Sequence, residues 1–238
     1  MQRHEPMFNV PGAVVAVIAV LVGVHVALRV LPELWSSWLT IALAFIPARY
    51  SNFPEAIPGG DIASVTSFLT YALVHASVLH LVINSVWLLA FGGAIANRVG
   101  TKPFLLFSAL CAIAGAGMFL AFNFGLPVPM VGASGAVSGM MGGTMRFLFG
   151  TIDSGEGLRA LRDNPRAVQL MPLRRAVLDR RVLAVTGAFV VANILAVFGL
   201  GGVSAGGIAW EAHLGGYFAG LFSFGLFQPP PTVVHQSA

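Results

Sequence analysis

Two side chains in this sequence are well suited to nucleophilic chemistry. Ser134 stands in the small-residue run Gly132-Ala133-Ser134-Gly135, and His213 lies near the start of a later apolar segment. Polar and ionisable side chains are costly inside apolar membrane segments and usually serve a function there. A serine hydroxyl becomes a nucleophile when a base takes its proton, and an imidazole suits that role near neutral pH. The pair therefore predicts nucleophilic catalysis at membrane depth.

A second pair, His80 and Asn84, offers side-chain N–H groups. Residues four apart lie on one face of a helix, so both side chains point the same way. Acyl transfer passes through an intermediate whose negatively charged oxygen needs prearranged donors. The backbone N–H of Ser134, at a helix N-terminus, adds a further donor and a favourable dipole. We expect His80, Asn84 and the Ser134 amide to form an oxyanion hole.

The group that orients His213 is not evident from the sequence. In many serine enzymes a carboxylate holds the histidine. The nearest acidic residue is Glu211, two positions earlier, and residues two apart do not share a helical face. The sequence therefore favours a Ser134–His213 dyad. Taken singly, each of these polar residues also has a plainer interpretation, as a packing residue or a hydrogen bond between helices.

A metal centre is not predicted. His75 and His80 are five apart, whereas the HExxH zinc pattern places two histidines four apart on one helical face. The single cysteine, Cys111, lies within an apolar segment and is expected to pack there. We therefore expect no metal in the site.

The elements that must position these residues are membrane-spanning helices. Of 238 residues, 57% are hydrophobic and only 9% are charged, whereas a soluble domain carries about 25% charged residues. A helix spans a bilayer with about 20 apolar residues, and the apolar runs lack the alternation of a membrane β-barrel. We expect an all-α membrane protein with six spans, at 12–31, 74–95, 103–123, 133–149, 182–202 and 209–228.

The basic residues predict an orientation for the bundle. Of 13 Lys and Arg residues, seven lie between the fourth and fifth spans: Arg159, Arg162, Arg166, Arg174, Arg175, Arg180 and Arg181. Cytoplasmic loops are enriched in such residues, so this loop and both chain ends are expected in the cytoplasm. The second, fourth and sixth spans then bring His80, Asn84, Ser134 and His213 to one depth near the outer face. Anchoring to lipid explains the basic loop better than nucleic-acid binding does, so no nucleic-acid partner is expected.

Small residues could bring the fourth and sixth spans together, because they let membrane helices approach closely. One predicted ridge is Ser134, Ser138 and Gly142, and the other is His213, Gly216 and Gly220. Close approach of the two ridges would place the serine within reach of the histidine. Gly132 and Gly135, on either side of the nucleophile, are expected to shape its surroundings.

The connections and chain ends complete the predicted organisation. Residues 32–73 form the longest outer connection, and their aromatic and proline residues predict a folded loop with short helices, partly inserted at the membrane interface. The parts of the chain are a cytoplasmic lead at 1–11, a membrane domain at 12–228 and a flexible cytoplasmic tail at 229–238.

Three motifs extend the prediction to a family. The serine run fits the pattern GxSG, residues 212–220 fit AHxxGxxxG, and residues 75–84 fit HxxxxHxxxN. In this order and on these spans, the motifs resemble those of rhomboid intramembrane serine proteases. The resemblance covers about residues 64–225 of the chain.

The resemblance implies a rhomboid-like six-helix bundle that hydrolyses peptide bonds in or near transmembrane segments of its substrates, without a cofactor. By motif match, Ser134 is the nucleophile and His213 is the general base and then the acid. The oxyanion hole falls to His80, Asn84 and the Ser134 amide. The fifth span and the loop at 203–208 are expected to gate substrate and water.

Two positions depart from the family pattern. Thr66-Ser67 stand where many members have Trp-Arg, and Ser138 stands where many bacterial members have a tyrosine that supports the histidine. The departures leave an alternative open, a non-catalytic rhomboid-like protein that binds membrane helices. A channel or transporter is less favoured, because the sequence has no convincing internal repeat.

The expected partners are transmembrane protein substrates and the lipid bilayer. The short loops are typical of a multi-pass protein of the bacterial inner membrane. The sequence predicts neither the identity of the substrate nor the oligomeric state.

Overall fold

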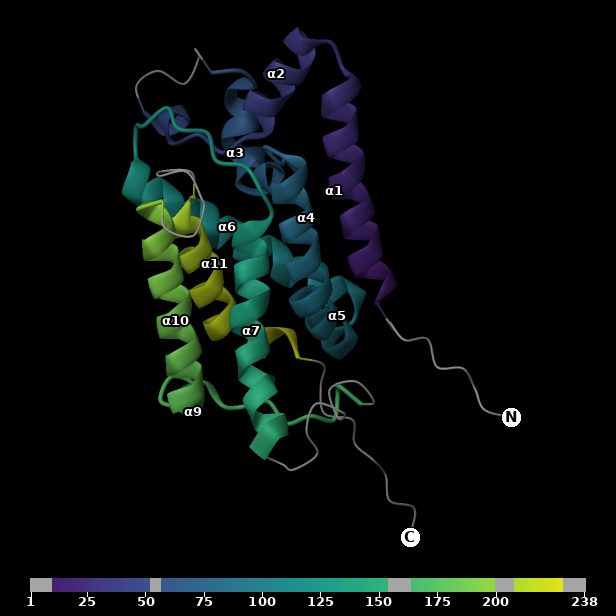
Figure 1. Ribbon diagram of the computed structural model, residues 1–238, viewed down its shortest axis with the longest axis vertical. Coiled ribbons are helices and arrows are strands. Elements are labelled where there is room, and N and C mark those ends of the chain that lie inside the picture. The colour runs from purple at the N-terminus through teal and green to yellow at the C-terminus, as the bar shows by residue number, and fades with distance from the viewer. Residues whose placement is uncertain (1–9, 52–56, 154–163, 200–207, 229–238) are drawn as a thin grey trace, which may run out of the picture.

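The structure is a computed structural model that describes residues 10–51, 57–153, 164–199 and 208–228 (Figure 1). Helices make up its regular structure, and the only β-type pairing in the described residues is an isolated bridge between Phe45 and Met130. The predicted fold class, an all-α rhomboid-like membrane bundle, is confirmed.

The first half of the chain forms short helices between longer ones. In order they are α1 (Gly12–Val30), α2 (Glu33–Leu43), η1 (Pro47–Tyr50), α3 (Gly60–Thr70), η3 (Tyr71–Leu73), α4 (Val78–Trp87), η4 (Leu88–Gly92), α5 (Gly93–Val99) and α6 (Thr101–Asn123). The η4 segment is a π-helical turn, so α4, η4 and α5 form one continuous helical span with a widened turn.

The second half contributes the centre of the bundle. Its elements are α7 (Ser134–Asp153), α9 (Leu173–Ala176), α10 (Arg180–Val197), α11 (Trp210–Ser223) and η5 (Phe224–Phe227). Figure 1 shows α7 and α11 in the middle, with α1, α4 and α5 on one side and α10 on the other. The packing of α11 is most extensive against α7 and α6.

Four segments are long and apolar enough to cross a membrane, judged by length and composition: Gly12–Val30, Val78–Val99, Thr101–Asn123 and Arg180–Val197. They correspond to four of the six predicted spans. The other two predicted spans correspond to α7, which contains several glycines and Arg146, and to α11, which has 14 residues. Both are shielded by neighbouring helices, and a helix that faces protein rather than lipid does not need a uniformly apolar surface.

Glycines set the distance between α7 and α11. A Cβ atom on Gly216 would collide with the carbonyl oxygen of Gly135, and one on Gly220 would collide with that of Gly139. The closest approach on α7 therefore runs through Gly135 and Gly139. Gly135 and Gly139 each follow one of the two serines of the predicted ridge. The third member of that ridge, Gly142, does lie at the contact, because its Cβ atom would collide with the Tyr217 carbonyl oxygen.

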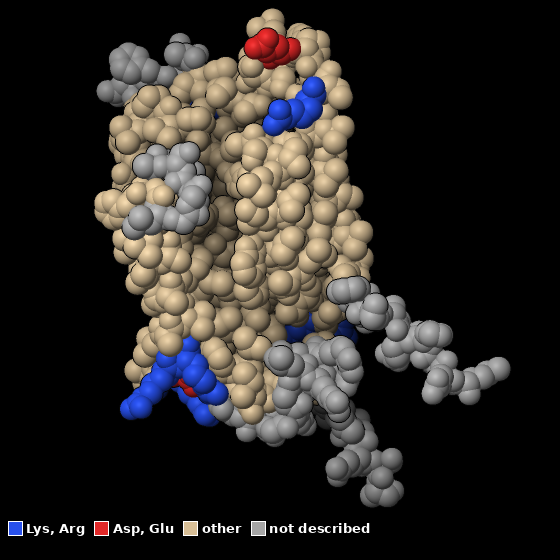
Figure 2. All heavy atoms as spheres, viewed as in Figure 1, with Lys and Arg blue, Asp and Glu red and all other residues tan. Residues whose placement is uncertain are grey.

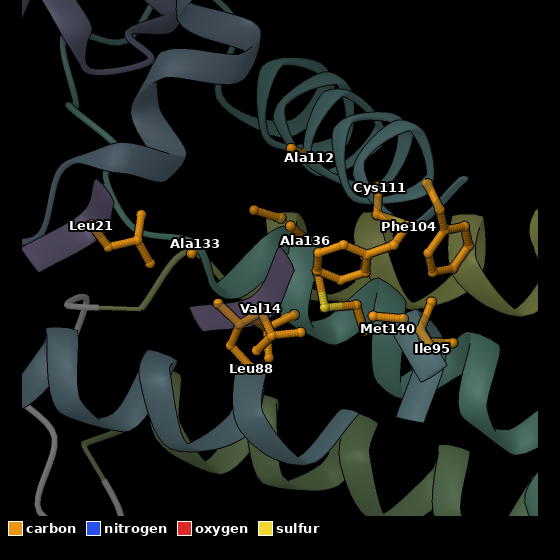
Figure 3. Packing of buried hydrophobic residues seen from close by; sticks show 14 of the residues in the cluster. Val14, Leu21, Leu88, Ile95, Phe104, Cys111, Ala112, Ala133, Ala136 and Met140 are labelled. Carbon is orange, nitrogen blue, oxygen red and sulfur yellow. The ribbon is translucent and has the colours of Figure 1, made fainter. Parts of the chain in front are cut away.

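An apolar core surrounds the central helix α7. Figure 3 shows side chains from α1, η4, α5 and α6 gathered around it. The labelled residues are Val14, Leu21, Leu88, Ile95, Phe104, Cys111, Ala112, Ala133, Ala136 and Met140. Cys111 is fully buried in this cluster, as expected for a packing residue.

The described part of the long connection after α1 is folded, as predicted, and a buried arginine links its elements. Arg49 is 3% exposed, and its guanidinium donates hydrogen bonds to the carbonyl oxygens of Ile41 at 2.5 Å and Pro58 at 2.7 Å. These bonds link the end of α2 to the turn before α3. The loop therefore has a buried arginine clamp, although it lacks the Trp-Arg dipeptide at Thr66-Ser67.

Charged residues gather at the two ends of the molecule. On the face in Figure 2, a broad band without Lys, Arg, Asp or Glu separates a basic cluster at the α9 end from a few charged atoms near the turn between α1 and α2. The basic cluster comprises Arg174, Arg175, Arg180 and Arg181 at α9 and the start of α10. An uncharged band of this kind is what a bilayer-embedded surface requires. The chain is an integral membrane protein.

Some predictions concern segments outside the described residues. These are most of the lead at 1–11, all of the tail at 229–238, all but one residue of the loop at 203–208, and Arg159 and Arg162 of the basic loop. The three-part division of the chain stays a prediction.

Candidate active site

Ser134 is the first residue of α7, and the loop before it is held in place by the turn around residues 71–75. Gly132 has a φ of +121° and donates its N–H to the Tyr71 carbonyl at 2.9 Å. The Ala133 N–H donates to Nε2 of His75 at 3.4 Å. Because the first N–H groups of a helix have no acceptor within it, the Ser134 amide is available to a ligand.

The structure brings Ser134 and His213 together. The distance between Ser134 Oγ and His213 Nε2 is 2.8 Å, which is a hydrogen bond between the start of α7 and the first turn of α11. The glycine contacts described above make this distance possible, because a larger residue at Gly216 would collide with the Gly135 backbone and push the two helices apart.

The other ring nitrogen of His213 contacts a residue that the sequence analysis did not identify. His213 Nδ1 lies 2.7 Å from Asn193 Oδ1 on α10. Asn193 is 6% exposed, and its own Nδ2 donates to the Phe189 carbonyl one turn earlier at 2.8 Å. The available signal was an amide within an otherwise apolar span. That signal is weak, because a lone asparagine often just joins two membrane helices.

His80 lies beside the loop that precedes Ser134. A Cβ atom added to Gly132 would sit 2.6 Å from Cε1 and 2.7 Å from Nε2 of His80, so the imidazole occupies the space that a side chain would need. Ser77 caps α4 by accepting the N–H of His80 at 3.1 Å, which fixes the start of the helix that carries this ring.

Asn84 lies one turn further along α4 and is 3% exposed. Its Nδ2 donates to the His80 carbonyl of the same helix at 2.9 Å. One amide hydrogen is therefore engaged within α4, and the second is left for another acceptor. The structure places His80 at the loop of Ser134, and it places Asn84 deeper, where its amide donates within α4.

Glu211 and Ser138 are the two residues that stand where a support for His213 would be expected. Glu211 accepts a hydrogen bond from Asn123 Nδ2 at 3.0 Å, so its carboxylate is turned towards α6. Ser138 is buried one turn after Ser134. Since Ser134 and Asn193 already occupy the two ring nitrogens of His213, neither Glu211 nor Ser138 holds the imidazole.

His75, the first residue of the HxxxxHxxxN pattern, also lies at the site, although the sequence did not predict a role for it. It is 4% exposed, and its Nε2 accepts the Ala133 N–H. Its ring lies edge-on to that of His80, with centroids 5.1 Å apart. His75 thus joins the loop before Ser134 to His80, the residue predicted as an oxyanion donor.

The fold and the site together define an all-α membrane protein with a hydrogen-bonded serine and histidine between its two central helices. Comparison with known proteins gives the family. A rhomboid domain matches residues 63–158, which include His80, Asn84 and Ser134 and end before His213. The match supports a rhomboid family protein, and the predicted family is confirmed.

Two curated relatives give the same result. The chain is similar to "Rhomboid protease GlpG" of Yersinia pestis (strain Pestoides F) and to the protein of the same name from Yersinia pseudotuberculosis serotype O:3 (strain YPIII). Each is 28% identical over 157 residues, which is 65% of this chain and 45% of the relative. The match thus spans about half the length of these relatives.

Proposed function

We propose that the protein is an intramembrane serine endopeptidase in which Ser134 is the nucleophile and His213 the general base. The observation that carries the proposal is the 2.8 Å hydrogen bond between Ser134 Oγ and His213 Nε2. It joins two helices at the centre of a membrane bundle, where an unused pair of polar side chains would be costly. The family and the relatives support the same reaction class.

The proposed reaction is acyl transfer in two steps. His213 Nε2 takes the hydroxyl proton as Ser134 Oγ attacks the substrate carbonyl, and the imidazolium then gives the proton to the leaving amine. Water hydrolyses the acyl-enzyme by the same route in reverse. The protonated and neutral forms of one imidazole thus serve both half-reactions.

The proposed oxyanion hole is built around the N-terminus of α7. The free N–H of Ser134 points out of the helix start, where the helix dipole favours negative charge. The imidazole of His80 lies beside Gly132 and is a second proposed donor. The second amide hydrogen of Asn84 is a third proposed donor, from the same face of α4. Removing one such donor costs about 3–4 kcal/mol of transition-state stabilisation in soluble proteases.

The proposed substrates are transmembrane segments that reach the site from the bilayer. Of the four candidate spans, α10 is the least enclosed, with 11% of its residues buried inside the protein. It therefore forms a wall of the site that few contacts hold in place. We further propose a bacterial inner membrane, with the basic α9 end in the cytoplasm and the site near the outer face.

The direct test uses the purified protein in proteoliposomes with single-pass transmembrane peptides and labelled casein as probes. Ser134→Ala abolishes cleavage, and a fluorophosphonate labels the wild type at Ser134 but does not label His213→Ala. Ser138→Ala is the matched control one turn along α7, and it keeps activity. Cleavage by purified Ser134→Ala at the wild-type rate would overturn the proposal. Binding of the peptides without turnover would support the alternative, a non-catalytic binder of membrane helices.

A further inference from the structure

We infer that Asn193 is the positioning residue of the site, which holds His213 in the tautomer and orientation that the reaction needs. The inference rests on the proposed function, because it assigns a third member to the Ser134–His213 pair. It begins from the 2.7 Å contact between His213 Nδ1 and Asn193 Oδ1.

The amide of Asn193 is fixed in one orientation by its own helix. Its Nδ2 donates to the Phe189 carbonyl at 2.8 Å. The opposite orientation would turn the amide oxygen towards that carbonyl oxygen, and two acceptors repel each other. The oxygen that faces His213 is therefore Oδ1, and it can only accept a hydrogen bond.

This orientation determines where the proton of the imidazole sits. Since Oδ1 of Asn193 can only accept, Nδ1 of His213 must carry the hydrogen. A neutral imidazole has one N–H and one bare nitrogen, so Nε2 is left with a lone pair. That lone pair faces the hydroxyl of Ser134 at 2.8 Å and can take its proton. Asn193 thus selects the tautomer in which His213 acts as a base.

An amide suits this role at membrane depth. A carboxylate gives the same hydrogen bond in many serine enzymes, and an asparagine gives it in some cysteine proteases. A charged residue in the centre of a span is costly, whereas a hydrogen-bonded amide costs much less. The site therefore gains an orienting acceptor without burying a charge.

Asn193 is not needed merely to attach α10 to α11, because other contacts do that. Thr186 Oγ1 lies 2.7 Å from the hydroxyl of Tyr217, and the ring of Phe189 stacks on that of Tyr217 with centroids 5.0 Å apart. Both contacts lie deeper along the two helices than the Asn193–His213 bond. They provide a matched control, because Thr186 joins the same two helices without touching His213.

The first experiment compares Asn193→Ala with Thr186→Val in the full-length protein. The readouts are the rate at which a fluorophosphonate labels Ser134 and the separate kcat and KM values for a cleaved transmembrane peptide. We expect Asn193→Ala to lower kcat and the labelling rate by about 10- to 100-fold with KM nearly unchanged, since acid–base catalysis contributes about 100- to 10,000-fold. Thr186→Val should change kcat and the labelling rate by less than about threefold.

Rescue by a conservative variant separates positioning from packing. Asn193→Asp keeps an oxygen acceptor opposite His213 Nδ1, so its labelling rate should lie between those of the wild type and Asn193→Ala. Asn193→Leu fills the same space without an acceptor and should match Asn193→Ala. If Asn193→Leu retains the wild-type rate, or if Thr186→Val loses as much as Asn193→Ala, the inference is wrong.

The second experiment does not depend on activity. Long-range proton–nitrogen NMR spectra of ¹⁵N-histidine-labelled protein distinguish Nδ1–H from Nε2–H, and the signals that vanish in His213→Ala belong to His213. We expect Nδ1–H in the wild type and a mixture of tautomers in Asn193→Ala. A wild type that carries Nε2–H would overturn the inference. A wild type that shows Nδ1–H but neither labels nor cleaves would instead count against the proposed function.

Discussion

The two interfaces of α11 differ in how they are built. Against α7 the backbones meet directly, because Gly216 and Gly220 face the carbonyl oxygens of Gly135 and Gly139. Against α10 the contact depends on side chains, through a stacked Phe189–Tyr217 pair and two hydrogen bonds. A backbone contact between close-packed helices resists displacement, whereas a few side chains can part and re-form.

The two interfaces hold different residues of the proposed site. Ser134 and His213, the proposed nucleophile and base, lie on the rigid interface, where close glycine contacts hold the two helices together. Asn193, which we propose orients His213, lies on the less enclosed helix α10, which also forms a wall of the proposed site. Four predictions test this contrast, from the largest expected effect to the smallest.

The largest effect is expected from filling the rigid interface. Gly220→Ala places a methyl group against the Gly139 carbonyl and should lower the free energy of unfolding by about 3 kcal/mol, the upper range for overpacking. Gly187→Ala on α10 is the control, since nothing lies within 4 Å of its added Cβ. Thermal unfolding in detergent compares the two. Equal melting temperatures would show that the α7–α11 contact is not rigid.

The second largest effect is expected from a substitution in the loop before Ser134. Gly132→Ala combines an unfavourable φ of +121° with a clash against His80, and should lower kcat/KM by about 100- to 1,000-fold, as loss of an oxyanion donor does. Gly125→Ala isolates backbone strain, because the φ of Gly125 is +78° but a Cβ atom added there would lie 3.9 Å from its nearest neighbour. Peptide cleavage assays measure both. A similar loss in Gly125→Ala would attribute the effect to strain alone.

A smaller effect is expected from weakening the α10 interface. Phe189→Ala removes the stack on Tyr217, and such pairs contribute about 1 kcal/mol beyond the area they bury. Cross-linking between single cysteines on α10 and α4 should then show a wider range of separations, while the melting temperature changes little. Phe198→Ala, at an exposed residue after the same helix, is the control. A melting temperature that falls as far as in Gly220→Ala would contradict the contrast.

The smallest effect concerns the first turn of α10. The side chain of Asp179 caps this helix and contacts Arg181, which lowers the pKa of its carboxyl from 3.8 to about 2. Because the folded-state pKa is depressed, the stabilisation is present above pH 3.8 and is lost as the pH falls towards 2. Asp179→Asn keeps a capping side chain and should remove this pH dependence. Circular dichroism as a function of pH measures the stability of the wild type and of Asp179→Asn. The same pH profile in both would exclude the Asp179 cap as the source of the pH dependence.

Much of the fold follows from the sequence because hydropathy is additive along a helix. The first, second, third and fifth predicted spans are long apolar runs, and α1, α4 to α5, α6 and α10 match them. The register of the glycine contact was less predictable. The predicted ridge of Ser134, Ser138 and Gly142 meets α11 at Gly142, but the closest approach is at Gly135 and Gly139, because crossing angle and rotation depend on both helices together.

The site was predictable where a motif brought several residues together and not where one residue acted through another. Ser134 and His213 were selected because two motifs and one depth agreed, and the structure places them in contact. Asn193 stands in no motif, and its contact with His213 depends on how α10 is rotated. The clamp by Arg49 was missed for a similar reason, since the carbonyl groups that it binds come from backbone turns with no sequence signature.

The order of synthesis gives the serine–histidine contact a further consequence. The two residues are 79 positions apart, and His213 belongs to α11, which is made after α7 and α10. At a translation rate of about 5–20 residues per second, the ribosome makes Ser134 about 4 to 16 s before His213. During that interval the Ser134 hydroxyl lacks its hydrogen-bond partner His213. Under the proposed function, a chain that has been made only as far as α10 therefore lacks its base, and cleavage begins only after α11 has packed against α7.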